Sequence, residues 1–510
     1  MILYSIRTVR SLYRCCARIT LAFLVAGISA CSSSSLKPWH TVALDEEFTL
    51  EMVNDGQVQN FDDYLALEDR LFGQLEEEIY ADTATGPAHA LERYSTGSAA
   101  DPEHHQQNWN HSFELTHPTA LGGVLLLHGM SDSPYTMRTL ANTLNQQGYH
   151  VIALRSPGHG TVPSGLRTTS WQDMAAAVRL AMQHLSSELD DKPVHIIGYS
   201  TGASLALNYA LDAIDQQAIP VPASVVLISP AIRVHPASAM AGFKNSLSAL
   251  PGMDGMAYLA VMDEFDPYKY NSFATNAAAQ VHQIIHHVDG RIQSLASNAT
   301  VAGRLPPILA IKSTVDATVT TDAVVDNLLI RLPANRNELL LFDINRQAAI
   351  KSTLLVDDPG PLTERLLNDA GLPFAVTMVK NKDANSRNVV ARRKPAYSED
   401  GYVVESLQLE WPVDVVSLSH LALPYPPDDP LYGESPVEGN DQVFLGNLAI
   451  KGERGLLKIP GEWLLRQRHN PFYDYMQARI LQWLDESGEL YAVGGNNAPD
   501  VAPYHSGSGE

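Results

Sequence analysis

The sequence predicts an α/β fold in which a doubly wound, mostly parallel sheet is covered by helices on both faces. From residue 122 onward, short apolar runs alternate with segments of helical periodicity, as in "GGVLLLHG" followed by "TMRTLANTLNQQ". The runs are continuously apolar, which a sheet buried on both faces requires. The chain has 510 residues, of which 45% are hydrophobic and 18% are charged, so it can bury a large core.

The first thirty residues have the pattern of an export signal. Four arginines precede the apolar run "ITLAFLVAGISA", which is too short to span a bilayer comfortably. Small residues end the run before Cys31, and "SSSS" follows, which resembles the bacterial lipoprotein box whose cysteine is acylated. Ser32 then implies an outer membrane location, facing the periplasm. An ordinary secretory signal that ends beside a cysteine is the alternative.

Cysteine content and charge limit the partners that we expect. Cys15 and Cys16 would leave with the signal, so the mature chain holds no cysteine pair for a disulfide. The net charge of −22 is spread along the chain, which argues against nucleic acid and anionic lipid headgroups as electrostatic partners. The expected contact with a membrane is therefore the lipid anchor, and the oligomeric state is not predicted.

The order of these patterns divides the chain into segments. We expect a signal at 1–30, a tether with a helix and an edge strand at 31–118, core at 119–234, a cap at 235–303, core at 304–345, an insertion at 346–410, core at 411–490 and a flexible tail at 491–510. The insertion is predicted to form a helix and then a hairpin. In the cap, methionines stand among helix-forming residues: Met240, Met253, Met256 and Met262.

The segment before the core carries two further patterns. Apolar residues at helical spacing in "NFDDYLALEDRLFGQLEEEIY" predict a helix clasped onto the main domain. A polar loop follows that contains His104, His105 and His111. Although three histidines could bind a metal, scattered histidines in a polar loop are usually solvated, so we predict no metal site.

The stretch "HIIGYSTGASLAL" bends sharply around Ser200, between a predicted strand and a predicted helix. Gly198 and Gly202 lack the side chains that would clash where a strand turns abruptly into a helix. A serine hydroxyl is a weak nucleophile that needs exposure and an adjacent base. We therefore predict that Ser200 is a nucleophile, and a glycine-rich turn with an inactive serine is the alternative.

Candidates for the base and its orienting acid follow downstream. Asp316 comes just after the run "PPILAIKS", where a carboxylate can orient a histidine, whereas Asp322 falls in the next helix pattern. The histidines after Asp316 are His420, His469 and His505. We favour His420 because it ends "VDVVSLSH", which we expect to be a strand. The other two lie in a polar stretch and in the tail.

These motifs together resemble the α/β-hydrolases of the monoacylglycerol lipase and carboxylesterase branch. The resemblance rests on "LLLHGMSDSPYTMRTLA", "GYHVIALRSPGHGTVP" and "VHIIGYSTGASLAL" over residues 121–235, and it resumes near Asp316 and His420. It implies a Ser200, Asp316 and His420 triad, in the chain order of this fold, with the backbone amides of Met130 and Thr201 as the oxyanion hole. His128 would then be a structural residue of the turn.

The function that this resemblance implies is hydrolysis of a carboxylic ester through an acyl-enzyme, which requires no metal or organic cofactor. A methionine-rich cap and a membrane anchor favour a small lipid-like acyl ester as the substrate, although the methionines could equally serve only to pack the cap. Two alternatives remain open. One is a peptidase or amidase that uses the same triad, and the other is a non-catalytic envelope lipoprotein that keeps the fold as a scaffold.

Overall fold

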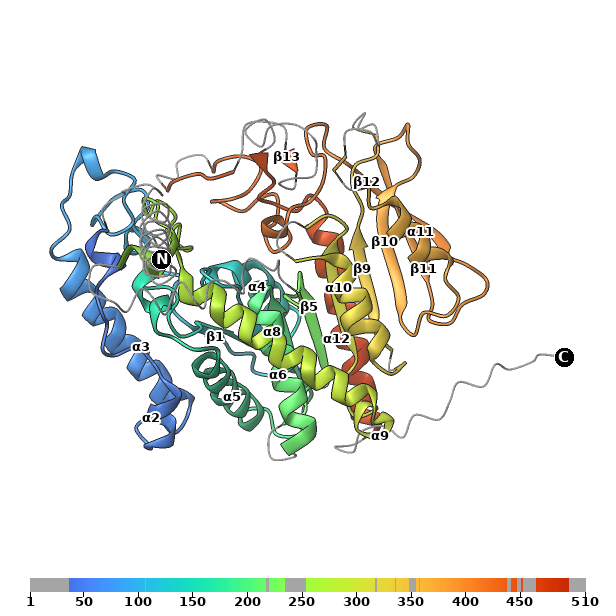
Figure 1. The fold of residues 1–510 in the computed structure, drawn as a ribbon, viewed down its shortest axis with the longest axis horizontal. Coiled ribbons are helices and arrows are strands. Elements are labelled where there is room, and N and C mark those ends of the chain that lie inside the picture. The colour runs from blue at the N-terminus through green and yellow to red at the C-terminus, as the bar shows by residue number, and fades with distance from the viewer. Residues whose placement is uncertain are drawn as a thin grey trace, which may run out of the picture. The chain divides into compact units, whose positions relative to one another are not determined.

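The structure is a computed structural model (Figure 1). It describes residues 36–494 apart from 106, 217–219, 234–253, 317–318, 335, 348–354, 357, 438–441, 447–450 and 453–464. The predicted signal, its Cys31, most of the tail and residues 235–253 of the predicted cap lie outside the described residues. The chain divides into two units, residues 1–38 and residues 39–510, and the sheet lies in the second.

A ten-stranded sheet with the order β1-β3-β2-β4-β5-β8-β9-β10-β11-β12 forms the centre of this unit. Neighbouring strands from β3 through β10 are parallel, and the three terminal strands β1, β11 and β12 are antiparallel to their neighbours. The strands are Phe113–Leu115 (β1), Gly122–Leu127 (β2), Tyr149–Leu154 (β3), Val194–Tyr199 (β4), Ser224–Ile228 (β5), Ile308–Ser313 (β8), Glu338–Phe342 (β9), Ala375–Asn381 (β10), Asn388–Lys394 (β11) and Val403–Glu410 (β12).

Helices cover both faces of this sheet, as the continuously apolar strands predict. Residues of α4 and α12 join one face in the main hydrophobic core, and α5, α6 and α8 pack on the other (Figure 1). The helices are Leu50–Asn54 (α2), Phe61–Leu75 (α3), Arg138–Gln146 (α4), Trp171–Ser187 (α5), Thr201–Gln216 (α6), Thr275–Ala296 (α8), Ala299–Ala302 (α9), Thr321–Ala323 (α10), Gly360–Asn368 (α11) and Tyr473–Gly494 (α12). Two small sheets pair Tyr258–Ala260 (β6) with Phe273–Ala274 (β7) and Lys451–Gly452 (β13) with Leu465–Arg466 (β14).

The predicted N-terminal helix is α3, and buried polar contacts attach it to the end of β3. Asn60 caps its first turn by accepting a hydrogen bond from the amide of Asp63. Arg155, the residue after β3, donates from Nε to Glu68 of α3 over 2.9 Å and pairs with Glu47 over 3.1 Å. Arg155 and Glu68 are 1% and 2% exposed. The helix is therefore held by a desolvated ion pair as well as by its apolar face.

The insertion before His420 contains the predicted helix, α11, and then antiparallel hairpins, which join the central sheet. The strand β10 pairs in parallel with β9, and β11 and β12 continue the same sheet (Figure 1). The edge of β9 that faces β10 is therefore paired, with Ala375 opposite Glu338 and Val376 opposite Leu339. The insertion therefore widens the central sheet by three strands.

The predicted strand "VDVVSLSH" is wrong. Residues 411–419 form no strand beyond an isolated bridge at Val415, and His420 begins a short 3-10 turn. The reason is that β8 and β10 already occupy both edges of β9. The segment instead crosses the carboxyl ends of the strands, where Asn345 donates to the carbonyl of Val416 and Ser313 donates to that of Leu418.

The predicted cap is too long at its carboxyl end. Residues 275–296, which we expected to belong to it, form α8, and α8 packs on α6 in the helical layer of the core (Figure 1). Its buried face is apolar and includes Val281, Ile284, Ile285, Val288 and Ile292. Sequence pattern alone does not separate a helix of the core from a helix of a cap.

Replacing Arg155 with Met should lower the free energy of unfolding by about 3–5 kcal/mol, because Glu68 would stay buried without its cationic partner. Urea denaturation measures the change. The matched control is Arg70→Met, which removes an ion pair between Arg70, on the same helix, and Glu46, which precedes α2. The side chains of that pair are 58% and 40% exposed, so its loss should cost less than about 1 kcal/mol. An equal decrease in the free energy of unfolding of the two variants would contradict the role of the buried pair of Arg155 and Glu68 in attaching α3.

Candidate active site

Ser200 stands at a sharp turn between β4 and α6, where the sequence predicted a nucleophile. Its φ angle is +55°, in the left-handed region that residues other than glycine rarely adopt. The amide of Ser200 donates to the carbonyl of Ile228 at the end of β5 over 2.9 Å. A non-glycine residue held in this conformation beside the first turn of a helix is the geometry of a nucleophile elbow.

Both glycines of the motif are required by close backbone packing. A Cβ atom on Gly198 would lie 2.3 Å from the carbonyl oxygen of Gly202. A Cβ atom on Gly202 would lie 2.3 Å from the carbonyl oxygen of Leu127, at the end of β2, and 2.5 Å from that of His128. The first turn of α6 can therefore approach the carboxyl ends of β2 and β4 only without side chains at these two positions.

The structure brings together the three residues that the sequence predicted as a triad. His420 Nε2 lies 3.0 Å from Ser200 Oγ, and His420 Nδ1 lies 2.9 Å from Asp316 Oδ2. A carboxylate only accepts, so Nδ1 donates to Asp316 and Nε2 is left to accept from the serine hydroxyl. The side chain of His420 is 5% exposed, and that of Asp316 is fully buried. This arrangement can take a proton from an attacking hydroxyl.

Asp316 is held as a carboxylate despite its burial. Burial alone would raise its pKa, but the positive charge of Lys312 and the contact with His420 lower the pKa of Asp316 well below its usual value. Lys312, in β8, contacts the same oxygen as His420, with its Nζ 2.6 Å from Asp316 Oδ2. Sequence reasoning missed Lys312. Its signal was a single charged residue inside the apolar run "PPILAIKS".

The competing candidates lie elsewhere. Asp322 is exposed on α10, and the described hydrogen bonds of His420 do not include it. His469 is buried in the segment that precedes α12, where its carbonyl accepts from Gln467. His505 lies outside the described residues.

The loop after β2 lies against the elbow, as an oxyanion loop would. A Cβ atom on Gly129 would lie 3.2 Å from Ser200 Cβ, so the two backbones are neighbours. Within the described part of the chain, the amides of Met130 and Thr201 donate no hydrogen bond to a protein acceptor. The side chain of Met130 packs on an apolar cluster from three further segments, which consists of Ala231, Val281, Ile285 and Val319.

His128 has the structural role that the sequence suggested. Its Nδ1 contacts the carbonyl of Gly129 over 2.9 Å, and its Nε2 accepts from the amide of Ser156 over 3.0 Å. Burial lowers the pKa of His128 to about 4. A neutral imidazole with both nitrogens bonded to backbone groups fixes the turn and leaves no free nitrogen for the serine.

Residues 262–274 support the loop after β2 through contacts that no sequence motif indicated. Ser131 has a φ angle of +66°, and its carbonyl accepts from the amide of Tyr270 over 2.9 Å. Lys269 forms an ion pair with the buried carboxylate of Asp132 in the same loop. Met262, which we expected to help form an apolar cap, is 50% exposed. The loop is therefore fixed by polar contacts from this segment.

The histidines of the N-terminal loop do not converge. His104 and His105 have ring centroids 5.9 Å apart, whereas His111 stacks on Phe72 of α3 with a centroid distance of 3.6 Å. Among the described residues, no group of three or more histidine, cysteine, aspartate or glutamate side chains is arranged to hold a metal ion.

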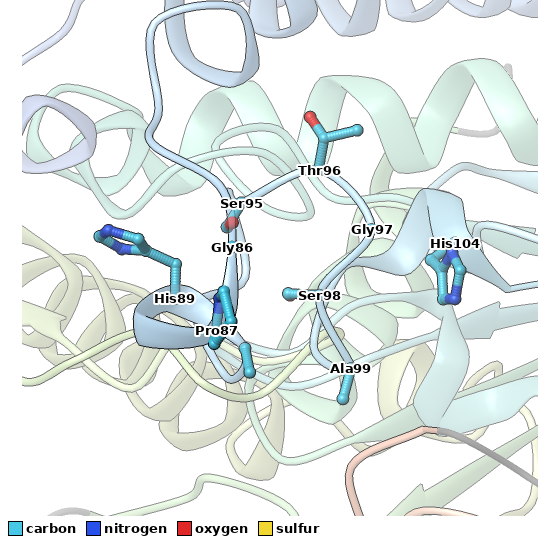
Figure 2. Close-up of a pocket in the computed structure, with 10 residues that line it drawn as sticks. Gly86, Pro87, His89, Ser95, Thr96, Gly97, Ser98, Ala99 and His104 are labelled. Carbon is cyan, nitrogen blue, oxygen red and sulfur yellow. The ribbon is translucent and has the colours of Figure 1, made fainter.

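A cavity of about 390 Å³ lies beside this loop (Figure 2). Its lining comes from two stretches of one loop and from His104: Gly86, Pro87, His89, Ala90, Ser95, Thr96, Gly97, Ser98 and Ala99. A second hollow of about 430 Å³ lies between residues 41–47 and 161–168. Neither is lined by Ser200, Asp316 or His420, so neither is the site of the predicted chemistry.

Replacing Gly202 with Ala should lower the free energy of unfolding by about 1–3 kcal/mol or more, because the added methyl group would overlap backbone carbonyl oxygens. Chemical denaturation measures the effect. The control is Gly290→Ala on the exposed face of α8, where a Cβ atom would meet nothing within 4 Å. That change should stabilise the chain by up to about 1 kcal/mol. A Gly202 variant as stable as the wild type would contradict the close approach.

Comparison with known proteins gives matches to hydrolases. Residues 118–300 match the family model described as "Serine aminopeptidase, S33". A thermostable monoacylglycerol lipase of Bacillus sp. (strain H-257) is 34% identical over 88 residues, which are 17% of this chain and 34% of that protein. The match thus spans only about a third of the relative's length.

Solved structures of lipolytic enzymes are also similar. A chain from the study of the metagenome-derived lipolytic enzymes LipS and LipT is 22% identical, with a TM-score of 0.35, over 46% of this chain and 87% of its own. The monoacylglycerol lipase of Paleococcus ferrophilus is 19% identical, with a TM-score of 0.35, over 46% of this chain and 88% of its own. The sheet order and the elbow are those of the α/β-hydrolase fold, and residues 118–300, which match the family model, include a stretch similar to a monoacylglycerol lipase.

Proposed function

We propose that this chain is a serine hydrolase that cleaves carboxylic esters through an acyl-enzyme. The observation that carries the proposal is the position of His420, whose two ring nitrogens lie within hydrogen-bond distance of Ser200 Oγ and Asp316 Oδ2. These are the contacts that a nucleophile, a general base and an orienting acid need. The similarity to a monoacylglycerol lipase supports an ester as the substrate.

In the proposed reaction, Ser200 Oγ attacks the ester carbonyl while His420 Nε2 takes the serine proton. The amides of Met130 and Thr201 stabilise the negative oxygen of the tetrahedral intermediate, and the dipole of α6 adds to that stabilisation. His420 then returns the proton to the leaving alcohol, and the acyl group stays on Ser200. Water, deprotonated by the same histidine, attacks the acyl-enzyme and releases the acid.

The proposed acyl group is apolar, as in monoacylglycerols or lysophospholipids. The support is the apolar cluster around Met130, because a chain bound through its carbonyl at the Met130 amide would begin beside that side chain. Methionine adapts to irregular apolar shapes because its side chain is unbranched. Residues 235–253 of the predicted cap lie outside the described residues, so the experiment below tests the acyl length.

A second candidate is a peptidase or amidase that uses the same three residues. The specific observation in its favour is the family model over residues 118–300, which is named for a serine aminopeptidase. The chemistry of the triad is common to both reactions. The two candidates differ in the leaving group, which is an alcohol in one and an amine in the other.

Ser200→Ala should reduce ester hydrolysis on the order of 10⁶-fold, because the nucleophile and its base act as a unit. The rates of p-nitrophenyl esters of increasing acyl length measure this loss. Aminoacyl anilides, tested in parallel, would reveal the peptidase instead by a higher kcat/KM. The control is Ser187→Ala, an exposed serine at the end of α5, which should keep the wild-type rate. A tenth of the wild-type rate in the Ser200 variant would refute the assignment.

We also propose that Cys31 carries a lipid anchor that holds the enzyme at the outer membrane, facing the periplasm. The support is the sequence pattern alone, since residues 1–35 lie outside the described residues. In the part of the chain that the structure describes, no helix is long and apolar enough to cross a bilayer.

Cys31→Ser should move the protein from the membrane fraction to the soluble fraction while its ester hydrolysis is retained, because the acyl chains would have no attachment site. Fractionation followed by immunoblotting measures this, with metabolic labelling by a palmitate analogue as a second readout. Cys16→Ser, within the predicted signal, is the control and should leave the distribution unchanged. A Cys31 variant that stays in the membrane fraction would rule out this anchor.

A further inference from the structure

Lys312 is a buried cation that contacts the triad acid directly. It belongs to β8, its side chain is 0% exposed, and its Nζ lies 2.6 Å from Asp316 Oδ2. The same oxygen accepts from His420 Nδ1 over 2.9 Å, and the other oxygen of Asp316 accepts from the amide of Val319 over 3.0 Å. The described contacts of the carboxylate thus include the ammonium group of Lys312, the imidazole of His420 and the amide of Val319.

A lysine at this depth costs free energy, because its charge is removed from water. A neutral residue in β8 would fill the same space without that cost, so we expect the charge to have a function. Because Lys312 and His420 contact the same oxygen of Asp316, the charge can have two effects. The cation fixes the orientation of Asp316, and it neutralises much of the negative charge that the imidazole would otherwise face.

The second effect bears on the protonated form of His420. A lone carboxylate stabilises an imidazolium, whereas a nearby cation disfavours it. Other titratable groups of the described residues lie on further elements of the site. The ring of Tyr199 in β4 is tilted by 34° to that of His420, with the ring centroids 5.3 Å apart, and the Tyr425 hydroxyl bonds to Thr136. Asp132 of the oxyanion loop is already paired with Lys269. Within the described contacts, Lys312 is a cation placed to offset the charge of Asp316.

We propose that Lys312 is a positioning residue of the triad, which orients Asp316 and keeps His420 able to accept a proton at lower pH than the Asp316 carboxylate alone would allow. The inference rests on the proposed serine hydrolase function and deepens it. Lys312 acts through Asp316 and touches no reacting atom.

The test follows the rate at which a fluorophosphonate probe labels Ser200 between pH 5 and pH 9. In this reaction Ser200 Oγ bonds to phosphorus, fluoride leaves, and His420 takes the serine proton, so no natural substrate is needed. The acid limb of the profile reports when the base becomes protonated. Lys312→Met should move that limb to higher pH by about one unit.

Two variants control for structure. Lys312→Arg keeps a positive charge next to Asp316 and should keep the wild-type acid limb. Lys394→Met removes another buried lysine, in β11 and bonded to the carbonyl of Asp369, and should also leave the limb in place. Near-UV circular dichroism checks folding. If the Met variant does not fold, Lys312→Gln replaces the cation with a neutral side chain that can still donate a hydrogen bond to Asp316. The acid limb of this variant should shift by the same amount.

The outcomes separate this inference from the function on which it rests. Labelling of wild-type Ser200 together with an unshifted acid limb in the neutral variants would overturn the role of Lys312 and leave the serine hydrolase intact. A shift of the same size in Lys312→Arg would also overturn it, because charge would not be the cause. Failure of the wild type to label at Ser200 at any pH would overturn both.

Discussion

The close backbone contact between the first turn of α6 and the end of β2 is the constraint on which the site depends. Gly202 lies so near the carbonyls of Leu127 and His128 that a single methyl group would not fit. That contact fixes the distance between the elbow and the loop that begins at Gly129. Because Ser200 and the amide of Met130 belong to these two segments, the nucleophile and one proposed oxyanion donor are set by the packing of the sheet and not by flexible side chains.

Much of the core and of the candidate site could be predicted from local sequence. The elbow depends on a glycine, serine and glycine spacing between a strand and a helix, and all of that information lies within a few residues. Asp316 was found because parallel strands present their carboxyl ends at one edge of the sheet, where polar residues gather. These inferences needed no knowledge of which strand pairs with which.

What sequence could not supply depended on contacts between distant segments. The apolar run before His420 resembles a strand, but its partner position beside β9 is taken by β10, and no local pattern states that. In the same way, α8 has the periodicity of any amphipathic helix, and only its packing on α6 makes it part of the core. Lys312 stood out as a charge in an apolar run, yet its partner, Asp316, became apparent only from the distance between them.

The widening of the sheet also explains how His420 is held. After β9 the chain forms β10, β11 and β12 before it reaches His420. His420 therefore does not directly follow a strand of the central sheet, unlike Ser200. Its backbone is tied down instead by side chains of the neighbouring strands. Ser313 of β8 donates to the carbonyl of Leu418, and the Tyr199 hydroxyl donates to the carbonyl of His420 over 3.2 Å. These two strands precede Asp316 and Ser200, so the strands that position these two residues also hold the backbone of His420 between them.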